Sequence, residues 1–219
     1  MNTGELRSTV YLDIETFASW DKPALEGVAL DGRLSDPVKI KADKEKKEGL
    51  ALHNQDVAWR KQALDSINGQ VWCVGVAIND EPAYCLIGES EETTLMQLDE
   101  ELQKHSFPII VGHNVIEFDA LFLFHRGLKY GLLNVVSAFA YKSGLRDTMV
   151  MLKGPAYRNY TSLNNAAKLL GIEGKGGMDG SMVHDLVVQK RSQEICDYCC
   201  ADVELTRKVY LILDRYGLS

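Results

Sequence analysis

The first strand-like segment of the chain carries two carboxylates in a pattern that could bind a cation. In YLDIETF, residues 11–17, Asp13 and Glu15 interrupt side chains that suit a buried strand. Residues two apart in a strand project from the same face, so the two carboxylates would point the same way. Like charges this close are costly unless a positive charge lies between them. Hard divalent ions such as Mg²⁺ or Mn²⁺ prefer carboxylate oxygens, so the segment predicts a metal site.

Two further acids fall where they could join this pair. Asp119 lies in the first turn of a helix that we predict after the apolar run 107–114. Asn114 ends that run, at the strand terminus where open α/β sheets usually bind ligands. Asp202 lies on a predicted C-terminal helix, and Tyr198, one turn earlier, shares its face. Four carboxylates at one end of a sheet predict two metal ions ~4 Å apart, which suits phosphodiester cleavage.

Length and composition predict one globular domain that spans residues 1–219. The 219 residues are 46% hydrophobic and 25% charged, which is enough for one sizeable core. No apolar run reaches the ~18 residues of a membrane helix, and MNTGELRST has no apolar signal region. We therefore expect a cytoplasmic protein with no membrane partner. The net charge of −7 argues against coating nucleic acid, although an enzyme that touches only a strand end needs few phosphate contacts.

The cysteines do not suggest a disulfide framework. Their number is odd, and three of them fall within one short segment. A zinc site is the alternative, but no histidines cluster beside them and the C-x2-C pair has no partner pair. We therefore favour reduced thiols that pack as small hydrophobes. The five residues are Cys73, Cys85, Cys196, Cys199 and Cys200.

The elements that must position these residues follow from periodicity and turn signals. Strand 8–17 comes first, and a long polar insert at 18–69 follows, read as a surface connection with a helix at 54–66. The first three strands would pair antiparallel, and the β-α-β units that follow would add parallel strands. This order predicts an α/β fold in which helices flank a mixed sheet. The remaining predicted elements are strands 70–80, 82–89 and 107–114, helices 89–105 and 115–127, a strand within 143–152, helix 161–171, a glycine-rich loop at 171–181 and helix 191–217.

Three short motifs now point to a family. LDIET, NVIEFD at 114–119 and YCCAD at 198–202 resemble the three exonuclease motifs of the DEDD superfamily of 3′–5′ exonucleases. These enzymes have a ribonuclease H-like fold. The tyrosine four residues before the last aspartate is similar to the DEDDy branch, which includes the proofreading domains of family-B DNA polymerases and ribonuclease D. Asp197 stands where the DEDDh branch would have histidine. The resemblance spans about residues 8–212 and is to stand-alone predicted exonucleases related to the polymerase domain.

The resemblance implies catalytic and metal-binding roles. Asp13, Glu15 and Asp202 would hold the ion that activates water, and Asp13 would bridge to a second ion. Asp119 would hold that second ion. Tyr198 would orient the attacking water, because an unperturbed phenol with a pKa of ~10 is a poor base at neutral pH.

The resemblance also implies a place for the 3′-terminal nucleotide. Thr16 and Phe17 would lie where it binds, and Asn114 and Phe118 would shape the same pocket. Phe17 and Trp20 are the nearest rings on which the terminal bases could stack.

Several other polar residues have less specific signals. For His113 and His184 we favour structural roles, and Asp147 could either support the site or cap a turn. The loop GKGGMDG lacks the phosphate-binding pattern G-x-x-x-x-G-K-[ST]. Further candidates for phosphate contact are Lys153, Arg158, Lys168 and Lys175.

The function expected from the resemblance is metal-dependent 3′–5′ exonuclease activity on single-stranded DNA ends, which would release nucleoside 5′-monophosphates by a two-metal-ion mechanism. A separate DNA polymerase or replication and repair proteins would be plausible partners. One alternative is an exoribonuclease of the ribonuclease D type, because the same metal chemistry serves both sugars. A second is a non-catalytic nucleic-acid-binding accessory subunit.

Overall fold

The structure is a computed structural model that describes residues 7–154, 160–174 and 177–218. The strands are β1 Thr9–Phe17, β2 Gln70–Ile78, β3 Tyr84–Leu86, β4 Ile109–Gly112 and β5 Leu145–Asp147. The α-helices are α1 Pro37–Lys61, α2 Glu91–Gln103, α3 Asp119–Tyr130, α4 Leu133–Phe139, α5 Thr148–Met151, α6 Leu163–Leu169, α7 Val183–Val188 and α8 Ser192–Arg215. The 3₁₀ helices are η1 Gln62–Leu64, η2 Lys142–Gly144 and η3 Gly180–Met182.

The strands form one mixed sheet in the order β3-β2-β1-β4-β5. β1 pairs antiparallel with β2, which pairs antiparallel with β3, whereas β4 is parallel to both β1 and β5. This topology confirms the predicted α/β mixed sheet, with β1 at its centre. A central β1 is covered on both faces, so its polar side chains must have a specific environment.

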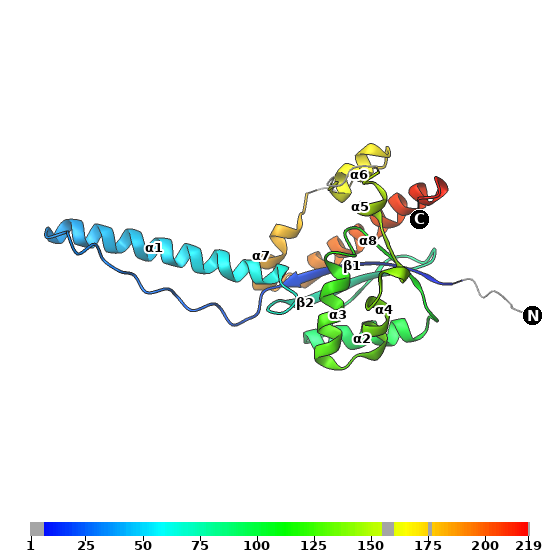
Figure 1. Cartoon of the computed structure of the whole chain (residues 1–219), viewed down its shortest axis with the longest axis horizontal. Coiled ribbons are helices and arrows are strands. Elements are labelled where there is room, and N and C mark those ends of the chain that lie inside the picture. Colours follow the sequence, from blue (N-terminus) through cyan, green and yellow to red (C-terminus); the bar gives the residue numbers. More distant parts are fainter. Residues whose placement is uncertain (1–6, 155–159, 175–176, 219) are drawn as a thin grey trace, which may run out of the picture.

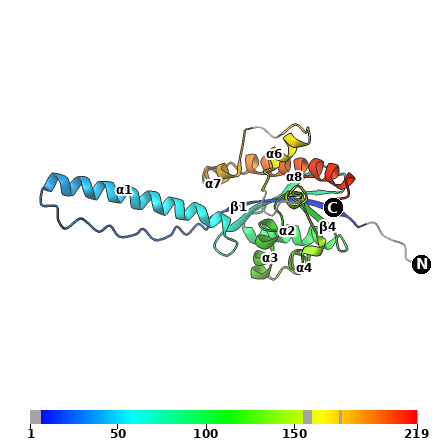
Figure 2. The same ribbon diagram turned by 45° about the horizontal axis from the view of Figure 1, so that its top comes forward.

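Helices cover both faces of the sheet (Figure 2). On one face, Val10, Leu12 and Ile14 join the core made with α2, α3 and α4. On the other face, Tyr11 packs edge-on against Tyr210 of α8, with ring centroids 5.9 Å apart. Because side chains alternate along a strand, residues 13 and 15 share the face of Tyr11 and lie under α8.

The connection between β1 and β2 differs from the prediction. Its C-terminal part is α1, a helix of 25 residues that begins at Pro37, and the predicted helix at 54–66 is only its last portion. The extended segment 18–36 runs back alongside α1. Trp59 Nε1 donates to the Ser19 carbonyl at 2.6 Å, and Gln55 Nε2 donates to the Pro23 carbonyl at 2.7 Å. Together the two segments project from the body of the molecule (Figure 1).

The helix α1 was missed because it has no apolar stripe along most of its length. Trp59 is its one buried residue. The helix is stabilised locally instead: the Asp36 carboxylate accepts the Val38 N–H at 2.9 Å, and Pro37 occupies the first turn. Lysines and acids four residues apart, such as Lys44 and Glu48, pair along the exposed face. Such pairs support a solvent-exposed helix without giving the hydrophobic period that predicts one.

Several helices also differ from the prediction. α3 begins at Asp119 rather than at residue 115, because residues 115–118 form a turn. The short helices α4 and α7 were not anticipated, and α8 is a single unbroken helix. Within the described part of the chain, no helix has the length and apolar character needed to cross a bilayer.

Candidate active site

The strand β1 places Asp13 and Glu15 side by side beneath α8. Asp13 lies opposite Gly75 of β2, and Glu15, which is buried, lies opposite Cys73. Glycine is required at position 75 because a Cβ there would lie 2.9 Å from the Cys199 sulfur. The close approach brings α8 onto the strand: a carboxylate oxygen of each acid and the Cys199 sulfur all lie within 4.8 Å of one another.

Helix α8 adds Tyr198 and Asp202 to this pair. Tyr198 and Asp202 are hydrogen-bonded through their side chains, and Asp202 is buried. Burial raises the pKa of the Tyr198 phenol well above its usual value, and the carboxylates of Asp202, Glu15 and Asp13 raise it further. A phenol with a raised pKa stays protonated at neutral pH, so it can donate a hydrogen bond. The structure therefore brings these four residues together.

Asp119 approaches the same strand from its edge. β4 pairs with β1 only at residues 9–11, so Ile14 lies beyond that ladder. The Ile14 N–H donates to Asp119 Oδ1 at 3.1 Å, between the two acids of β1. Burial raises the pKa of Asp119 to about 7, and the nearby Asp147 charge adds to this increase. The Asp119 carboxylate therefore reaches the backbone between Asp13 and Glu15, but it is not part of the group that lies within 4.8 Å.

Asp147 holds the loop that leads to Asp119. Its carboxylate accepts the N–H of Asn114 at 2.9 Å and that of Ile116 at 3.0 Å. It also caps α5 by accepting the Met149 N–H at 2.9 Å. Asn114 itself has a φ of 67°, in the left-handed region that asparagine tolerates better than most residues. Asp147 therefore combines the supporting and the capping roles that the sequence left open.

The residues present fit a divalent metal. The side chains supply hard carboxylate oxygens, which Mg²⁺ and Mn²⁺ prefer. The raised pKa of buried Asp119 shows that its negative charge is poorly compensated in the protein alone. A cation between the acids would offset both this burial and their mutual repulsion.

The residues predicted to bind the terminal nucleotide differ in their exposure. Thr16 is buried, and its hydroxyl donates to the Ala63 carbonyl at 2.6 Å. The Phe17 ring has no exposed surface, so its contact with a nucleotide stays a prediction that the observed packing does not favour. Trp20 lies 4.7 Å from that ring, centroid to centroid, and is 59% exposed. Asn114 and Phe118 are half-buried in and next to the loop that leads to α3.

The other polar candidates separate clearly. The two ring nitrogens of His113 contact Thr148 Oγ1 at 2.8 Å and the Thr161 carbonyl at 2.7 Å, as expected for a structural histidine. Lys168 is exposed on α6, and Lys153 is half-buried after α5. Arg158 and Lys175 lie outside the described residues, so their predicted phosphate contacts are not addressed by the structure.

Sequence reasoning missed the position of Cys199 beside the carboxylates. Its sulfur lies 3.6 Å from Asp13 Oδ2. The signal was present, because Cys199 is three residues before Asp202 and so shares a helix face with it.

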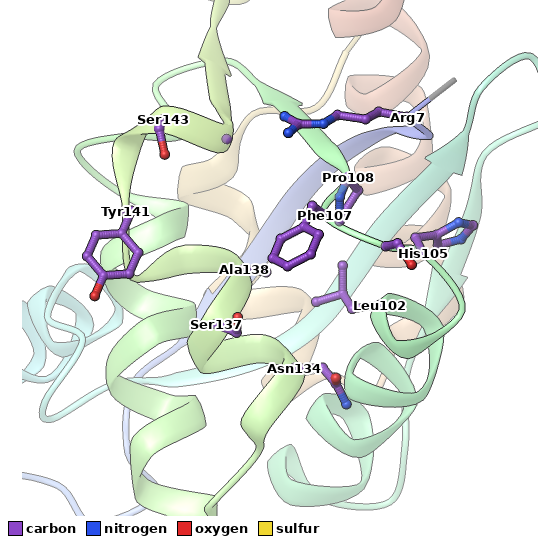
Figure 3. A pocket seen from close by; sticks show the side chains of 12 residues that line it. Arg7, Leu102, His105, Phe107, Pro108, Asn134, Ser137, Ala138, Tyr141 and Ser143 are labelled. Atoms are coloured by element: carbon purple, nitrogen blue, oxygen red, sulfur yellow. The ribbon is translucent and has the colours of Figure 1, made fainter. Parts of the chain in front are cut away.

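The acidic group is separate from a surface pocket of about 620 Å³ near the start of β1 and β4 (Figure 3). That pocket is lined by Arg7, His105, Phe107 and Tyr141 among others, and none of the described residues that line it is acidic. It therefore lacks the groups that the predicted chemistry requires.

Comparison with known proteins relates this geometry to a family. Residues 140–217, which include α8 with Tyr198 and Asp202, match the model of a family described as a predicted 3′–5′ exonuclease related to the exonuclease domain of PolB. The structure is similar to that of the family B DNA polymerase from the hyperthermophilic archaeon Pyrobaculum calidifontis, with a TM-score of 0.63 and 15% identity. That similarity covers 98% of this chain and 25% of the polymerase chain.

The chain resembles a PolB-type exonuclease domain. The resemblance inferred from the three motifs is thereby confirmed, and the PolB-type exonuclease fold is ribonuclease H-like. The chain spans about a quarter of the polymerase chain, and at 15% identity the likeness concerns the fold. No curated protein gives a significant match to this sequence.

Proposed function

We propose that the chain is a metal-dependent 3′–5′ exonuclease that acts on single-stranded DNA ends and releases nucleoside 5′-monophosphates. The observation that carries the proposal is the convergence of Asp13, Glu15, Tyr198 and Asp202 between β1 and α8. Packing of the core does not explain why three acids and a phenol lie between β1 and α8, because burying charge is costly unless a ligand compensates it.

The acids divide into two groups by position. Asp13, Glu15 and Asp202 would hold one ion, and Asp119 with Asp13 would hold a second. Two bound Mg²⁺ or Mn²⁺ ions would supply charge stabilisation for the attacking and leaving oxygens of an in-line displacement. The Ile14 N–H bonds the Asp119 carboxylate, and Asp147 fixes the loop that leads to Asp119, so the position of this carboxylate does not depend on the metal alone.

Tyr198 acts as a hydrogen-bond donor in this proposal. Burial and the neighbouring carboxylates raise its pKa, so it would orient the attacking water by donating a hydrogen bond. The hydrogen bond with Asp202 holds the phenol in position. Thr16, Asn114 and Phe118 would lie at the terminal nucleotide, and the exposed ring of Trp20, which packs on the buried Phe17 ring, would stack on a terminal base.

The DNA preference rests on the two matches. The family whose model matches residues 140–217 is related to the exonuclease domain of PolB, and the similar solved structure is that of a DNA polymerase. A free 3′ end of single-stranded DNA is then the partner, and a separate DNA polymerase or a repair protein is a further one.

The test uses matched 5′-labelled single strands of DNA and RNA, incubated with Mg²⁺ or Mn²⁺. We expect a ladder that shortens from the 3′ end of DNA, disappears with EDTA and is absent in Asp13→Ala. Tyr198→Phe should slow cleavage by about 10–100-fold and leave metal binding nearly unchanged, because a hydrogen bond to a charged group contributes about 1.5–3 kcal/mol.

A matched control is Asp197→Asn. Asp197 adjoins Tyr198 on α8, but it is exposed and bonds Gln193 on the outer face. This variant should keep wild-type activity. Cleavage of RNA alone would replace DNA with RNA as substrate. No cleavage of either strand, with metal bound, would refute the enzyme and favour a binding subunit.

A further inference from the structure

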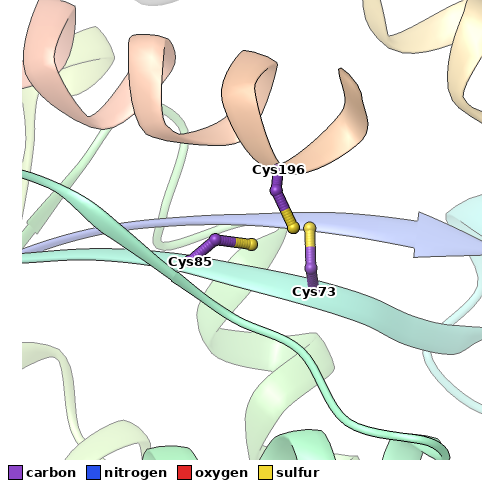
Figure 4. Close-up of side chains that lie close together, drawn as sticks. All are labelled: Cys73, Cys85 and Cys196. Carbon is purple, nitrogen blue, oxygen red and sulfur yellow. The ribbon is translucent and has the colours of Figure 1, made fainter. Parts of the chain in front are cut away.

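The cysteines gather at one place between the sheet and α8. Cys73 comes from β2, Cys85 from β3 and Cys196 from the first part of α8, and the three thiols point toward one another (Figure 4). Their sulfur atoms all lie within 4.8 Å of one another. The sequence argued against zinc because the C-x2-C pair had no partner pair, and the fold supplies partners from two other strands.

The remaining cysteines adjoin the same cluster. The thiol of Cys73 interacts electrostatically with those of Cys85, Cys196 and Cys199. The thiol of Cys85 interacts in the same way with those of Cys196 and Cys200, and Cys200 lies one turn after Cys196 on α8. All five cysteines are free thiols in the structure.

The geometry of the cluster is near that of a thiolate metal site. Zinc–sulfur bonds of about 2.3 Å in a tetrahedron put the sulfurs about 3.8 Å apart. The sulfur–sulfur distances in the structure, all within 4.8 Å, would need to shorten by about 1 Å at most to reach this value. Thiolates are soft ligands that select Zn²⁺ over Mg²⁺ or Mn²⁺, so the cluster and the carboxylates would take different metals.

Burial also suits a structural metal. Cys73 and Cys196 are buried, so bulk water is excluded from one side of the cluster. Cys85 on the edge strand β3 and Cys200 are half-buried, which leaves an access route for the ion. Core packing alone explains small apolar side chains here, but it does not require sulfur in three separate elements.

We propose that Cys73, Cys85 and Cys196 bind Zn²⁺, with Cys200 as the fourth ligand. Binding releases the thiol protons and fastens α8 to β2 and β3. The same helix carries Tyr198 and Asp202, so the zinc site stabilises the part of α8 that the candidate active site uses. The proposal concerns a second metal site and does not depend on the exonuclease function.

The test replaces Zn²⁺ with Co²⁺, which absorbs visible light strongly in tetrahedral thiolate sites. Reduced, chelator-treated full-length protein is titrated with Co²⁺ under anaerobic conditions. We expect sulfur-to-cobalt charge-transfer bands, tetrahedral visible bands, and displacement of both by Zn²⁺. Cys85 and Cys200 are half-buried. Loss of a residue that only supports a metal ligand weakens metal binding by roughly 10–100-fold, so Cys85→Ser and Cys200→Ser, which each remove a ligand, should weaken Co²⁺ binding by more than that. Circular dichroism verifies that both variants fold.

The matched control is Asp13→Asn, which should keep the cobalt bands and lose nuclease activity. This contrast separates failure of the zinc site from failure of the proposed function. Protection of the thiols from a thiol reagent by Zn²⁺ would support the site. Five reactive thiols in Zn²⁺-treated protein, or cobalt bands that only Asp13→Asn removes, would overturn it.

Discussion

At the residue scale, burial sets the protonation state of the groups in the candidate site. Tyr198 keeps its proton because burial and three neighbouring carboxylates disfavour the phenolate. Asp119 has its pKa raised to about 7, because burial disfavours the carboxylate and the Ile14 N–H compensates it only in part. A bound cation would reverse the balance for the acid, since it favours the charged form.

His184 is a buried titratable group that packs against two aromatic rings. Its ring stacks on Phe17 at 4.8 Å and meets Trp59 edge-on at 4.4 Å. Among the described residues, neither ring nitrogen has a hydrogen-bond partner. Burial lowers the pKa of His184. The positive charges of Arg60 and Lys22 lower it further, whereas the negative charges of Asp185 and Asp56 raise it.

We predict that His184 makes the protein less stable as the pH falls. The unfolded chain takes up a proton near pH 6.5 that folded His184 resists, so the free energy of unfolding drops below about that pH. His184→Phe should reduce this slope. Denaturant unfolding between about pH 5 and pH 8 measures it, over the range in which histidine titrates. The exposed control His53→Gln should keep the wild-type slope, and equal slopes in all three proteins would contradict the prediction.

At the element scale, one buried ion pair joins α2 to α3 and β2. Glu91, at the start of α2, accepts Arg126 Nε at 2.7 Å and is also bonded by the guanidinium Nη2. The same carboxylate accepts the Tyr130 hydroxyl at 2.8 Å and the Val71 N–H at 2.8 Å. The sequence placed acids at this helix start, but only packing shows that Glu91 is buried with a cation.

Removing one partner of this pair should be costly. Arg126→Met leaves the Glu91 charge buried, and we expect a loss of about 3–5 kcal/mol in the free energy of unfolding. The double variant with Glu91→Gln should lose less than the two single variants combined, because no charge remains buried. Arg191→Met, at the exposed pair with Glu194, should change stability by no more than about 0.5 kcal/mol. Denaturant unfolding of all variants decides, and strict additivity would refute the coupling.

At the scale of the whole molecule, an excess of negative charge coincides with a concentration of acids between β1 and α8. The chain carries a net charge of −7, and the buried acids include Glu15, Asp119 and Asp202. Folding without a cation therefore works against repulsion that the unfolded chain does not have. A ligand that binds only the folded state stabilises it by mass action.

We predict that Mg²⁺ raises the melting temperature. At a concentration of about 100 times Kd, the gain is about 2.7 kcal/mol, which corresponds to roughly 5–10 °C for a chain of this size. Thermal unfolding with Mg²⁺ and with EDTA measures the difference. Asp13→Asn should lose most of the shift, whereas Cys85→Ser should keep it because Mg²⁺ does not bind thiolates. An unchanged shift in Asp13→Asn would place the Mg²⁺ elsewhere.

Local patterns in the sequence determined the sheet, the shared face of Asp13 and Glu15, and the shared face of Tyr198 and Asp202. These follow from strand and helix periodicity, which depends only on neighbours along the chain. The same local logic failed for α1, because a helix held by caps and ion pairs has no apolar period.

Tertiary structure alone decided which residues of different elements contact one another. It brought Asp119 to the Ile14 N–H, buried the Phe17 ring, and gathered Cys73 and Cys85 beside Cys196. Each of these contacts joins residues far apart in the chain. Their distances depend on how the sheet and the helices pack, which the local spacing of residues does not determine.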